Sequence, residues 1–328
     1  MEDVKEMKAA LLLDYGPVEN FRIVDIPPRD PGPKEVMIKV QYAGLRWPDI
    51  MVRRGLLGRQ HTKPWVPGME AFGIIEKVGS EVKDFELGQS VISMIAEGSF
   101  AEYLTAPTNL INKVPEGVRG DQMLCYAVNM VVAHLLVYGW GKIQPGETIL
   151  LHTAAGGVGQ MVLQLIKRRG TDNKVIALSS RDEKLDLCRA EGADYCINYK
   201  KTDYVREILN LFENKRVVDI SLNGVGGDTL KKDRQVIRPL GRWILYGVIG
   251  GVQPLDIYAH SYDSITIMPF SIIPFIGTEI HSKAVQFMQE WVTTEKLIEP
   301  TVYPLEEIAK AQDDMEHGRT SGKTVIKI

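Results

Sequence analysis

Cysteine is scarce in this chain, with only three among 328 residues, at Cys125, Cys188 and Cys196. No two of them form a CxxC pair, and three cannot build the disulfide framework of a small secreted domain. Residues 1–6 are charged and contain no apolar signal-peptide core. These features favour a reducing compartment, and we expect the protein to be cytoplasmic.

Long hydrophobic runs and a large charge of one sign are also missing. No segment approaches the roughly 20 apolar residues of a membrane span. The most apolar long stretch, residues 127–140, is interrupted by Asn129 and His134, which favours a buried helix. A net charge of −3 and a pI near 6.1 give no reason to expect nucleic acid or an anionic membrane as a partner. The length suits about two globular domains.

The most informative segment is residues 148–159. A β-prone run at 148–152 leads into a turn of small residues, and residues 160–169 carry apolar side chains at helical spacing before Gly170. This order of strand, turn and helix is typical of a dinucleotide site, because the backbone can approach a pyrophosphate and the helix N-terminus stabilises the anion. Ala154 replaces the first glycine of the usual G-x-G-x-x-G pattern.

The end of the next strand-like run, residues 174–178, indicates which dinucleotide is bound. Twenty residues after Gly159, where an NAD site places Asp or Glu on the ribose hydroxyl, this chain has Ser179. The residues that follow are small or basic, namely Ser180, Arg181 and Lys184. They suit a 2′-phosphate, so we predict NADPH as the cofactor. A compatible interpretation makes Ser180 a helix N-cap, with Glu183 three residues later.

Two kinds of pattern divide the chain. Residues 8–115 contain short strands broken by Gly and Pro, which predicts a β-barrel-like domain, whereas residues 122–262 alternate strands with helices, which predicts a doubly wound parallel sheet. The fold class is therefore α/β. The expected strands are 8–13, 21–26, 35–42, 72–78, 90–95, 100–105, 148–152, 175–178, 195–198, 217–222, 242–246, 264–269 and 323–328, with a helix at 282–293.

Several motifs, taken in order, resemble one known family along nearly the whole chain. They are PGMEAFGIIEKVG at 67–79, GSFAEY at 98–103, VN at 128–129, PGE at 145–147, AAGGVG at 154–159, GAD at 192–194, VGGD at 225–228 and SGK at 321–323. The chain resembles the medium-chain dehydrogenase/reductase superfamily in its zinc-free quinone oxidoreductase branch, among VAT-1-like, ζ-crystallin-like and enoyl reductase-like proteins. The resemblance implies a GroES-like catalytic domain at 1–121 and 266–328 and a Rossmann NADP-binding domain at 122–265.

The zinc alcohol dehydrogenases of this superfamily bind their metal through a Cys, a His and a further Cys or Asp. By resemblance, Arg46 stands at the position of the first Cys, and Met69 replaces the His before Glu70. The histidines, His61, His134, His152, His260, His281 and His317, form no H-x-x-x-H or Cys/His grouping. We therefore expect no metal, and hydride transfer to an acceptor that is already polarised.

The resemblance also implies the site residues. We expect the cofactor to be bound by Ala155, Gly156, Gly157, Val158, Gly159, Ser179, Ser180, Lys184, Tyr199, Asn223, Gly247, Val248 and Lys323. The candidate catalytic residues are Arg46, Asp49 and Asn129. Quinone reductases usually carry Asn in place of Arg46. Arg46 could bind the cofactor, pair with Asp49, or hold a substrate carboxylate or carbonyl. Lys184 and Tyr199 could also be plain surface residues, and Asn129 a helix cap.

The expected activity is NADPH-dependent reduction of the C=C bond of an α,β-unsaturated carbonyl compound, a quinone or an enone. A basic segment, Arg46, Arg53, Arg54, Arg59, His61 and Lys63, is either a solvated loop or a surface that binds the phosphates of an acyl-CoA. The second interpretation makes the protein an enoyl-CoA reductase. A third makes it a non-catalytic NADPH-binding protein in trafficking or structure.

Residues 265–280 are too apolar to face water freely. They include Met268, Phe270, Ile273 and Phe275. In the family that this chain resembles, the edge strand of the Rossmann sheet pairs across a two-fold axis, and such a segment also forms the wall of an apolar pocket. We therefore expect a homodimer that acts on a small molecule, with no membrane span.

Overall fold

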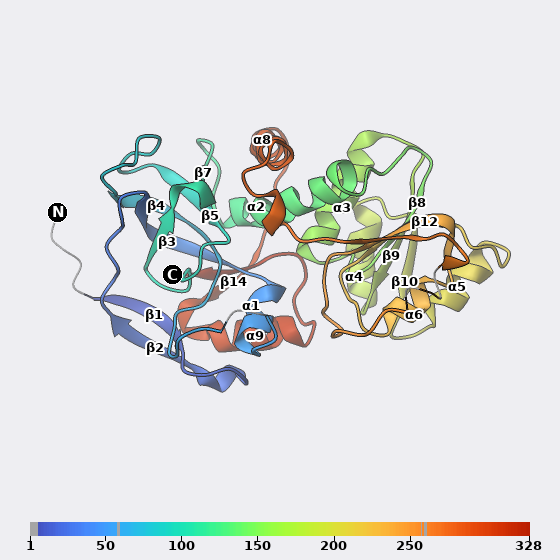
Figure 1. The fold of residues 1–328 in the computed structure, drawn as a ribbon, viewed down its shortest axis with the longest axis horizontal. Coiled ribbons are helices and arrows are strands. Elements are labelled where there is room, and N and C mark those ends of the chain that lie inside the picture. The colour runs from blue at the N-terminus through green and yellow to red at the C-terminus, as the bar shows by residue number, and fades with distance from the viewer. Residues whose placement is uncertain (1–5, 58–59, 257, 259–260) are drawn as a thin grey trace. The chain divides into compact units, whose positions relative to one another are not determined.

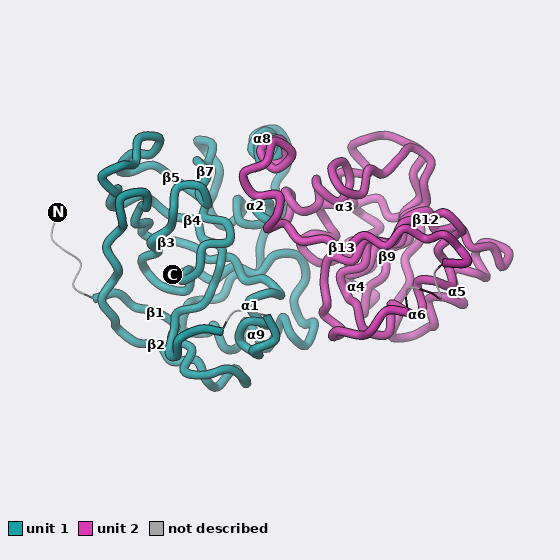
Figure 2. Tube along the Cα trace, in the orientation of Figure 1, with its two compact units in different colours: residues 1–128, 285–328 teal, residues 129–284 magenta. Residues whose placement is uncertain are grey.

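The structure is a computed structural model that describes residues 6–57, 60–256, 258 and 261–328. The chain forms two compact units (Figure 1 and Figure 2): unit 1 comprises residues 1–128 and 285–328, and unit 2 comprises residues 129–284. Unit 1 is thus built from both ends of the chain. The domain limits expected from the sequence, 121 and 265, stay predictions. Residues 1–5, Arg59 and His260, which entered the sequence arguments, lie outside the described residues.

Unit 1 consists mainly of β-structure. Its central strand β3 (Glu35–Leu45) pairs antiparallel with β4 (Glu70–Val78), β6 (Tyr103–Pro107) and the C-terminal strand β15 (Thr324–Lys327). The sheet has the order β14-β15-β3-β4-β5-β7, with β6 beside β3. The remaining strands are β1 (Met7–Leu12) and β2 (Phe21–Ile26), which pair with each other, β5 (Ser90–Met94), β7 (Ile111–Lys113) and β14 (Thr301–Pro304). A strand from the far end of the chain therefore completes the sheet.

Two short helices of unit 1 lie in connections between its strands. α1 (Trp47–Arg53) begins with Pro48 in its first turn, where the fixed φ of proline suits a helix start. α9 (Ile308–Glu316) packs against α1. Two longer helices, α2 (Gly120–His134) and α8 (Glu279–Thr294), contain the divisions between the two units.

Unit 2 contains a parallel sheet in the order β10 (Tyr195–Asn198), β9 (Lys174–Ser179), β8 (Thr148–Leu151), β11 (Val218–Asn223), β12 (Ile237–Leu245) and β13 (Thr266–Pro269). Its helices are α3 (Gly157–Arg169), α4 (Asp182–Ala190), α5 (Tyr204–Leu211) and α6 (Thr229–Asp233). The strand order reverses between β8 and β11. This doubly wound arrangement confirms the expected α/β fold and predicts a ligand site at the carboxyl ends of the strands near that reversal.

The strands of unit 2 are apolar along their length because a parallel sheet is covered on both faces. Leu150, Ile176, Leu222 and Ile244 are fully buried, one on each of four neighbouring strands. Trp243 is the largest side chain of this core.

One helical stretch among the described residues, 120–139, is long and apolar enough to cross a membrane by length and composition. It joins α2 to a π-helical turn at Leu135–Gly139, and 83% of its most apolar window is buried inside the protein. A buried core helix has the same properties, as the sequence predicted for residues 127–140.

Candidate functional site

The glycine turn of unit 2 presents an uncapped helix N-terminus. β8 ends at Leu151, and α3 begins at Gly157 with Gly156 as its N-cap, so no side chain occupies the first amides of this 13-residue helix. Those amides and the positive end of the helix dipole suit an anion. The residues present therefore fit the pyrophosphate of a dinucleotide, with Ala155, Gly156, Gly157, Val158 and Gly159 around the turn.

The glycines of this turn are needed for different reasons. A Cβ at Gly159 would lie 2.5 Å from the carbonyl oxygens of Thr153 and Ala154, and one at Gly157 would clash with the side-chain amide of Asn129. At Gly156 the only close atom would be the Thr153 carbonyl oxygen, at 3.1 Å. Gly159 is thus required by packing on backbone atoms, Gly157 leaves space for the Asn129 side chain, and Gly156 has one tight backbone contact and no other close neighbour. Asn129 lies against the turn, and its predicted place among the catalytic residues stays a prediction.

The predicted 2′-phosphate residues lie at the carboxyl ends of β9 and β10. Ser179 ends β9, and its carbonyl oxygen accepts a hydrogen bond of 3.1 Å from the backbone N–H of Tyr199, which follows β10. Tyr199 is 41% exposed and Lys184 is partly buried on the first turn of α4. Burial, aided by the charge of Arg181, lowers the pKa of Lys184. An adjacent phosphate would favour the charged form of this lysine.

The N-cap hypothesis for Ser180 is wrong. α4 begins at Asp182, its N-cap is Arg181, and no side chain caps it. The reason is that β9 extends to Ser179, so Ser180 leaves the sheet and the extended residue Arg181 (φ −144°, ψ 149°) enters the helix.

An acidic residue also lies beside this end of the sheet. The Asp182 carboxylate accepts a hydrogen bond of 2.7 Å from Asn198 and pairs with Lys201. These two side-chain hydrogen bonds lower the pKa of Asp182. Its charge is therefore offset by a lysine within the chain, which reduces its repulsion of a 2′-phosphate.

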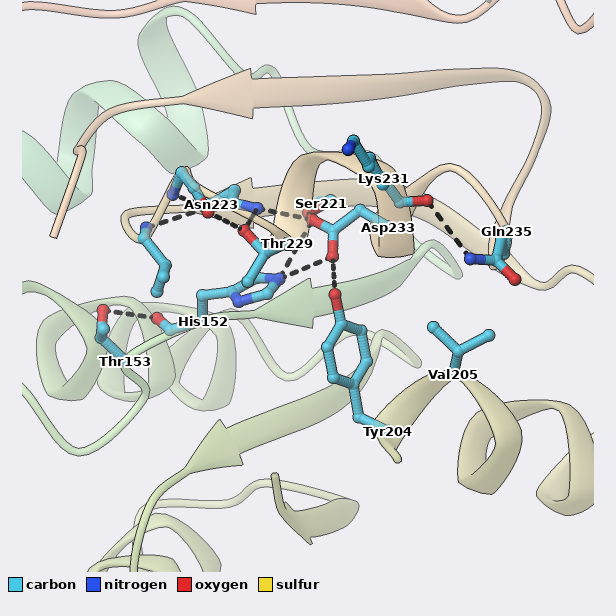
Figure 3. A network of polar contacts seen from close by, with 12 residues as sticks. His152, Thr153, Tyr204, Val205, Ser221, Asn223, Thr229, Lys231, Asp233 and Gln235 are labelled. Atoms are coloured by element: carbon cyan, nitrogen blue, oxygen red, sulfur yellow. Dashed lines mark hydrogen bonds and ion pairs between the residues drawn. The ribbon is translucent and has the colours of Figure 1, made fainter. Parts of the chain in front are cut away.

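The predicted nicotinamide-side residues follow β11 and β12. Asn223 ends β11, but its side chain is fully buried, and its amide bonds only to groups of the protein (Figure 3). Gly247 and Val248 follow β12, and the backbone of Gly247 packs so tightly on the carbonyl of Gly224 that a Cβ would clash. Asn223 thus holds the loop at 224–227, and its predicted place on the nicotinamide side stays a prediction.

Sequence reasoning missed Asp233, the centre of this buried network. The Asp233 carboxylate accepts hydrogen bonds from His152, Tyr204, Ser221 and Asn223. In the sequence, Asp233 is one polar residue within a polar segment, and no motif around it indicates that it is buried. A histidine directly before the glycine turn was the one available signal.

The candidate catalytic residues Arg46 and Asp49 lie together in unit 1. Arg46 is the N-cap of α1, and its backbone N–H donates a hydrogen bond of 2.8 Å to Asp49 Oδ2. The Arg46 Nε lies 3.8 Å from the same oxygen. The contact with Asp49, one of the three roles left open for Arg46, is therefore present, and the catalytic roles of both residues stay predictions.

Asp49 is a buried carboxyl group with one oxygen that could still accept a hydrogen bond. It is 1% exposed, and its Oδ1 has no hydrogen-bond partner among the described residues. Burial raises the pKa of Asp49 to about 6, although the charge of Arg46 opposes the shift. A group with this pKa can hold or release a proton near neutral pH.

Lys323 is buried in unit 1. Its ammonium forms an ion pair with the Glu70 carboxylate, which also accepts a hydrogen bond of 3.2 Å from the backbone N–H of Val128. The ammonium thus has a partner within the protein, and its predicted contact with the cofactor stays a prediction. In the described part of the chain, no group of three or more His, Cys, Asp or Glu is arranged to hold a metal ion.

The basic segment is largely neutralised inside unit 1. Arg53 is 2% exposed and bonds to Gln312, the Gly16 carbonyl and Glu316. Three other described side chains of the segment also have acidic partners, Arg54 with Glu316, His61 with Glu97 and Lys63 with Asp14. This segment is therefore not the free cationic surface that the acyl-CoA hypothesis assumed.

Comparison with known families agrees with both halves of the fold. A model of the alcohol dehydrogenase GroES-like domain matches residues 32–116, and a model of the zinc-binding dehydrogenase family matches residues 157–290. The first match lies in unit 1, and the second covers most of unit 2.

Individual proteins are similar over longer ranges. The synaptic vesicle membrane protein VAT-1 homolog of Rattus norvegicus is 30% identical over 244 residues, which are 74% of this chain and 59% of that protein. A quinone oxidoreductase of Pseudomonas syringae superposes with a TM-score of 0.91 at 26% identity over 98% of this chain and 100% of its own. A mycobacterial protein solved in complex with NADPH gives 0.91 at 28% identity, with 98% and 100% covered.

Proposed function

Because the chain belongs to the medium-chain dehydrogenase/reductase superfamily, in its quinone oxidoreductase branch, we propose that it is an NADPH-dependent reductase of α,β-unsaturated carbonyl compounds, with quinones and enones as substrates. The observation that carries the proposal is the uncapped glycine turn before α3, next to strand ends that offer serine and lysine in place of a carboxylate. The NADPH complex of the mycobacterial relative supports the choice of cofactor.

The residues of unit 2 bind and orient the cofactor. Backbone amides at 156–159 hold the pyrophosphate, and Ser180, Lys184 and Tyr199 hold the 2′-phosphate. When bound, NADPH supplies a hydride, and the protein contributes mainly the alignment of donor and acceptor, an effect that can be worth several kcal/mol.

Unit 1 contributes Arg46 and Asp49. Arg46 is a donor for a developing negative charge on a carbonyl oxygen, and Asp49 is a group that can hold a proton near neutral pH. We assign these two roles because one residue is cationic and the other is a buried carboxyl with an unsatisfied oxygen.

Two other functions remain as alternatives. An enoyl-CoA reductase would use the same chemistry on a thioester, but the ion pairs of Arg53, Arg54, His61 and Lys63 within the chain weaken the argument for a CoA phosphate site. A non-catalytic NADPH-binding protein would bind the cofactor tightly and turn over no acceptor. The relation to a vesicle membrane protein is the observation that favours this class.

We also propose a cytoplasmic homodimer. β13 is the outer strand of the sheet in unit 2, so one of its edges is available for pairing. The segment that follows it is apolar, with Phe270 and Phe275 stacked at 5.6 Å, Trp140 edge-on to Phe275 at 5.7 Å, and Ile273 64% exposed. A second copy of the chain would cover this surface.

The test follows NADPH oxidation at 340 nm with a panel of quinones and enones and a parallel panel of enoyl-CoA thioesters. We expect turnover on the first panel. Preference for the CoA panel would favour the enoyl-CoA alternative, and tight binding of NADPH without turnover on either would favour the non-catalytic one.

The cofactor assignment is tested with Lys184→Ala. Loss of the ammonium should raise the KM for NADPH about tenfold or more, because a charge-assisted contact to phosphate is lost, and should leave the KM for NADH nearly unchanged. Equal effects on both cofactors would contradict the 2′-phosphate assignment.

A further inference from the structure

A buried polar network joins four elements of unit 2 at one carboxylate. Asp233, the last residue of α6, is fully buried, and the side chains around it come from His152 after β8, Tyr204 at the start of α5, and Ser221 and Asn223 on β11 (Figure 3). The distances to the carboxylate are 2.9 Å from His152 Nε2, 2.7 Å from Tyr204 Oη, 2.7 Å from Ser221 Oγ and 2.8 Å from Asn223 Nδ2.

Asp233 is ionised in this setting. Burial alone would raise the pKa of its carboxyl, but the charge interaction with His152 and the donated hydrogen bonds outweigh burial and hold the pKa below its usual value. An ionised carboxylate can only accept hydrogen bonds. Each group that faces it must therefore donate, including His152 Nε2 and the Asn223 amide.

This requirement fixes the orientation of Asn223. Its Nδ2 must point to Asp233 and also donates to Thr229 Oγ1 at 2.9 Å. Its Oδ1 is then turned toward the next loop, where it accepts the backbone N–H groups of Val225 and Gly226, both at 2.9 Å. All four hydrogen bonds that an asparagine side chain can make are used, and a flipped amide would lose those to Asp233, Val225 and Gly226.

The loop held by Asn223 in turn holds the loop after β12. Gly250 donates to the Val225 carbonyl at 2.7 Å, and Gly227 donates to the Gly251 carbonyl at 2.9 Å. The second loop contains Gly247 and Val248, which we assign to the nicotinamide side of the cofactor. The geometry of that side thus depends on which way one buried amide points.

The network also reaches the glycine turn. His152 directly precedes Thr153, a non-glycine residue with φ +50°, and its backbone N–H donates to the Leu222 carbonyl at 3.1 Å. The hydroxyl oxygen of Tyr246, which follows β12, lies 3.4 Å from both the His152 carbonyl oxygen and Thr153 Oγ1. Asp233 therefore contacts residues at the ends of β8 and β11, and His152 connects it to Tyr246 after β12.

We propose that Asp233 is a positioning residue of the cofactor site, which sets the orientation of Asn223 and through it the two loops on the nicotinamide side. The inference rests on the proposed function, since it assumes that a dinucleotide binds at these strand ends. Asp233 itself is too deeply buried to touch the cofactor. Its effect should fall on the nicotinamide half and spare the adenosine half, which we place at β9 and β10.

The experiment measures dissociation constants by titration calorimetry for NADPH and for adenosine 2′,5′-bisphosphate, a fragment without nicotinamide. The key variants are Asn223→Asp and the exchange variant that combines Asn223→Asp with Asp233→Asn. The single change puts two carboxyl groups in hydrogen-bond contact, where both cannot remain ionised. In the exchange variant the amide at position 233 donates to the carboxylate at position 223, so the donor and the acceptor have changed places. The carboxylate at position 223 can still accept from the backbone N–H groups of Val225 and Gly226.

We expect Asn223→Asp to weaken NADPH about tenfold or more and the bisphosphate less than about threefold, as for a buried polar group left unpaired. The exchange variant should bind NADPH within about threefold of the original protein. An exchange variant as weak as the single variant, or equal losses for both ligands, would overturn the proposal.

Two further variants keep the test decisive. Ser221→Ala removes another donor to Asp233 but does not touch the loop, so it should lower thermal stability without changing either dissociation constant. If circular dichroism shows that Asn223→Asp does not fold, the nearly isosteric Asp233→Asn carries the test, and NADPH affinity unchanged in that variant would refute the role. An original protein that binds neither NADPH nor the bisphosphate would instead contradict the proposed function.

Discussion

At the scale of single residues, the charges that matter are buried and have defined partners. The carboxylates of Glu70 and Asp233 are each bound by more than one donor, whereas Asp49 keeps one oxygen without a partner among the described residues. A buried carboxyl group that lacks full hydrogen bonding favours its neutral form. Asp49 is therefore the residue at which pH should act on unit 1.

The first prediction concerns Asp49→Asn. The pKa of Asp49 is raised from 3.8 to about 6 in the folded protein. The folded state thus binds more protons than the unfolded state between these values, and its stability falls as pH rises through that window. Asn cannot ionise, so the variant does not lose stability in this window, and its amide oxygen can still accept from the Arg46 N–H. The free energy of unfolding of the variant relative to the original protein should therefore rise with pH by up to about 3 kcal/mol.

Thermal unfolding of both proteins from pH 4 to pH 8 measures this difference. The same change at Asp172, an exposed carboxylate in unit 2, is the control for a general effect of charge. A difference between Asp49→Asn and the original protein that stays constant with pH would show that Asp49 is ionised throughout.

At the scale of elements, the turn between β8 and α3 separates structural glycines from a functional one. Gly159 and Gly157 allow α3 to pack on the turn and on Asn129, and they would be needed in the absence of any ligand. A methyl group at Gly156 would meet one tight contact within the protein, the Thr153 carbonyl oxygen at 3.1 Å, and we propose that the missing side chain also leaves space for a ligand at the helix N-terminus.

Two alanine variants test this division. Gly159→Ala should destabilise the protein by about 1–3 kcal/mol because its methyl group would press on two backbone carbonyls. Gly156→Ala should cost no more than about 1 kcal/mol of stability, the usual advantage of glycine over alanine at an N-cap, and should raise the NADPH dissociation constant about tenfold by steric exclusion.

Denaturant unfolding and NADPH titration on both variants provide the measurements. The two variants serve as each other's control, because the same atom is added three residues apart. A Gly156→Ala variant that is as unstable as Gly159→Ala, or that binds NADPH normally, would contradict the assignment of Gly156 to the cofactor.

The pair of helices α1 and α9 shows a second effect at this scale. Arg53 joins them through Gln312 and Glu316 and also bonds to the Gly16 carbonyl. The basic residues of the 46–63 segment had suggested a surface for an anionic ligand. At Arg53 the charge instead holds two helices and a turn together, because burial requires that it be paired.

At the scale of the whole molecule, the proposed homodimer depends on the outer strand β13 and the apolar segment after it. We expect Ile273→Lys to shift the mass measured by light scattering after size exclusion from dimer to monomer, since it places a charge on the surface that the second copy would cover. Leu187→Lys is the matched control, because Leu187 is also an exposed apolar residue, on α4 beside β9 and β10 at the opposite edge of the sheet. Dimers in both variants would contradict the use of this surface.

The sequence by itself determined the features that depend on neighbouring residues. The strands at 21–26 and 195–198 lie where alternation and turn residues predicted them, and the glycine turn is followed by a helix. The lack of a carboxylate at Ser179 is likewise a local fact. The start of β12 was not predictable in this way, since the strand begins at Ile237 and not at 242. Pro239 and Gly241 are unusual within a strand and hide its first part. The strand also passes through Leu240 at φ +63° and pairs with β11 across a register shift.

Only the tertiary structure decided which side chains meet across long distances in the chain. Three contacts show this. Arg53 pairs with Glu316, 263 residues away in the chain, and Lys323 pairs with Glu70, 253 residues away. Asp233 bonds to His152, 81 residues away. No local pattern contains these pairings, because each follows from the burial of a charged group that the fold must neutralise. Periodicity and turn chemistry act over a few residues and so are readable in sequence, whereas the partner of a buried charge is set by how distant strands and helices pack.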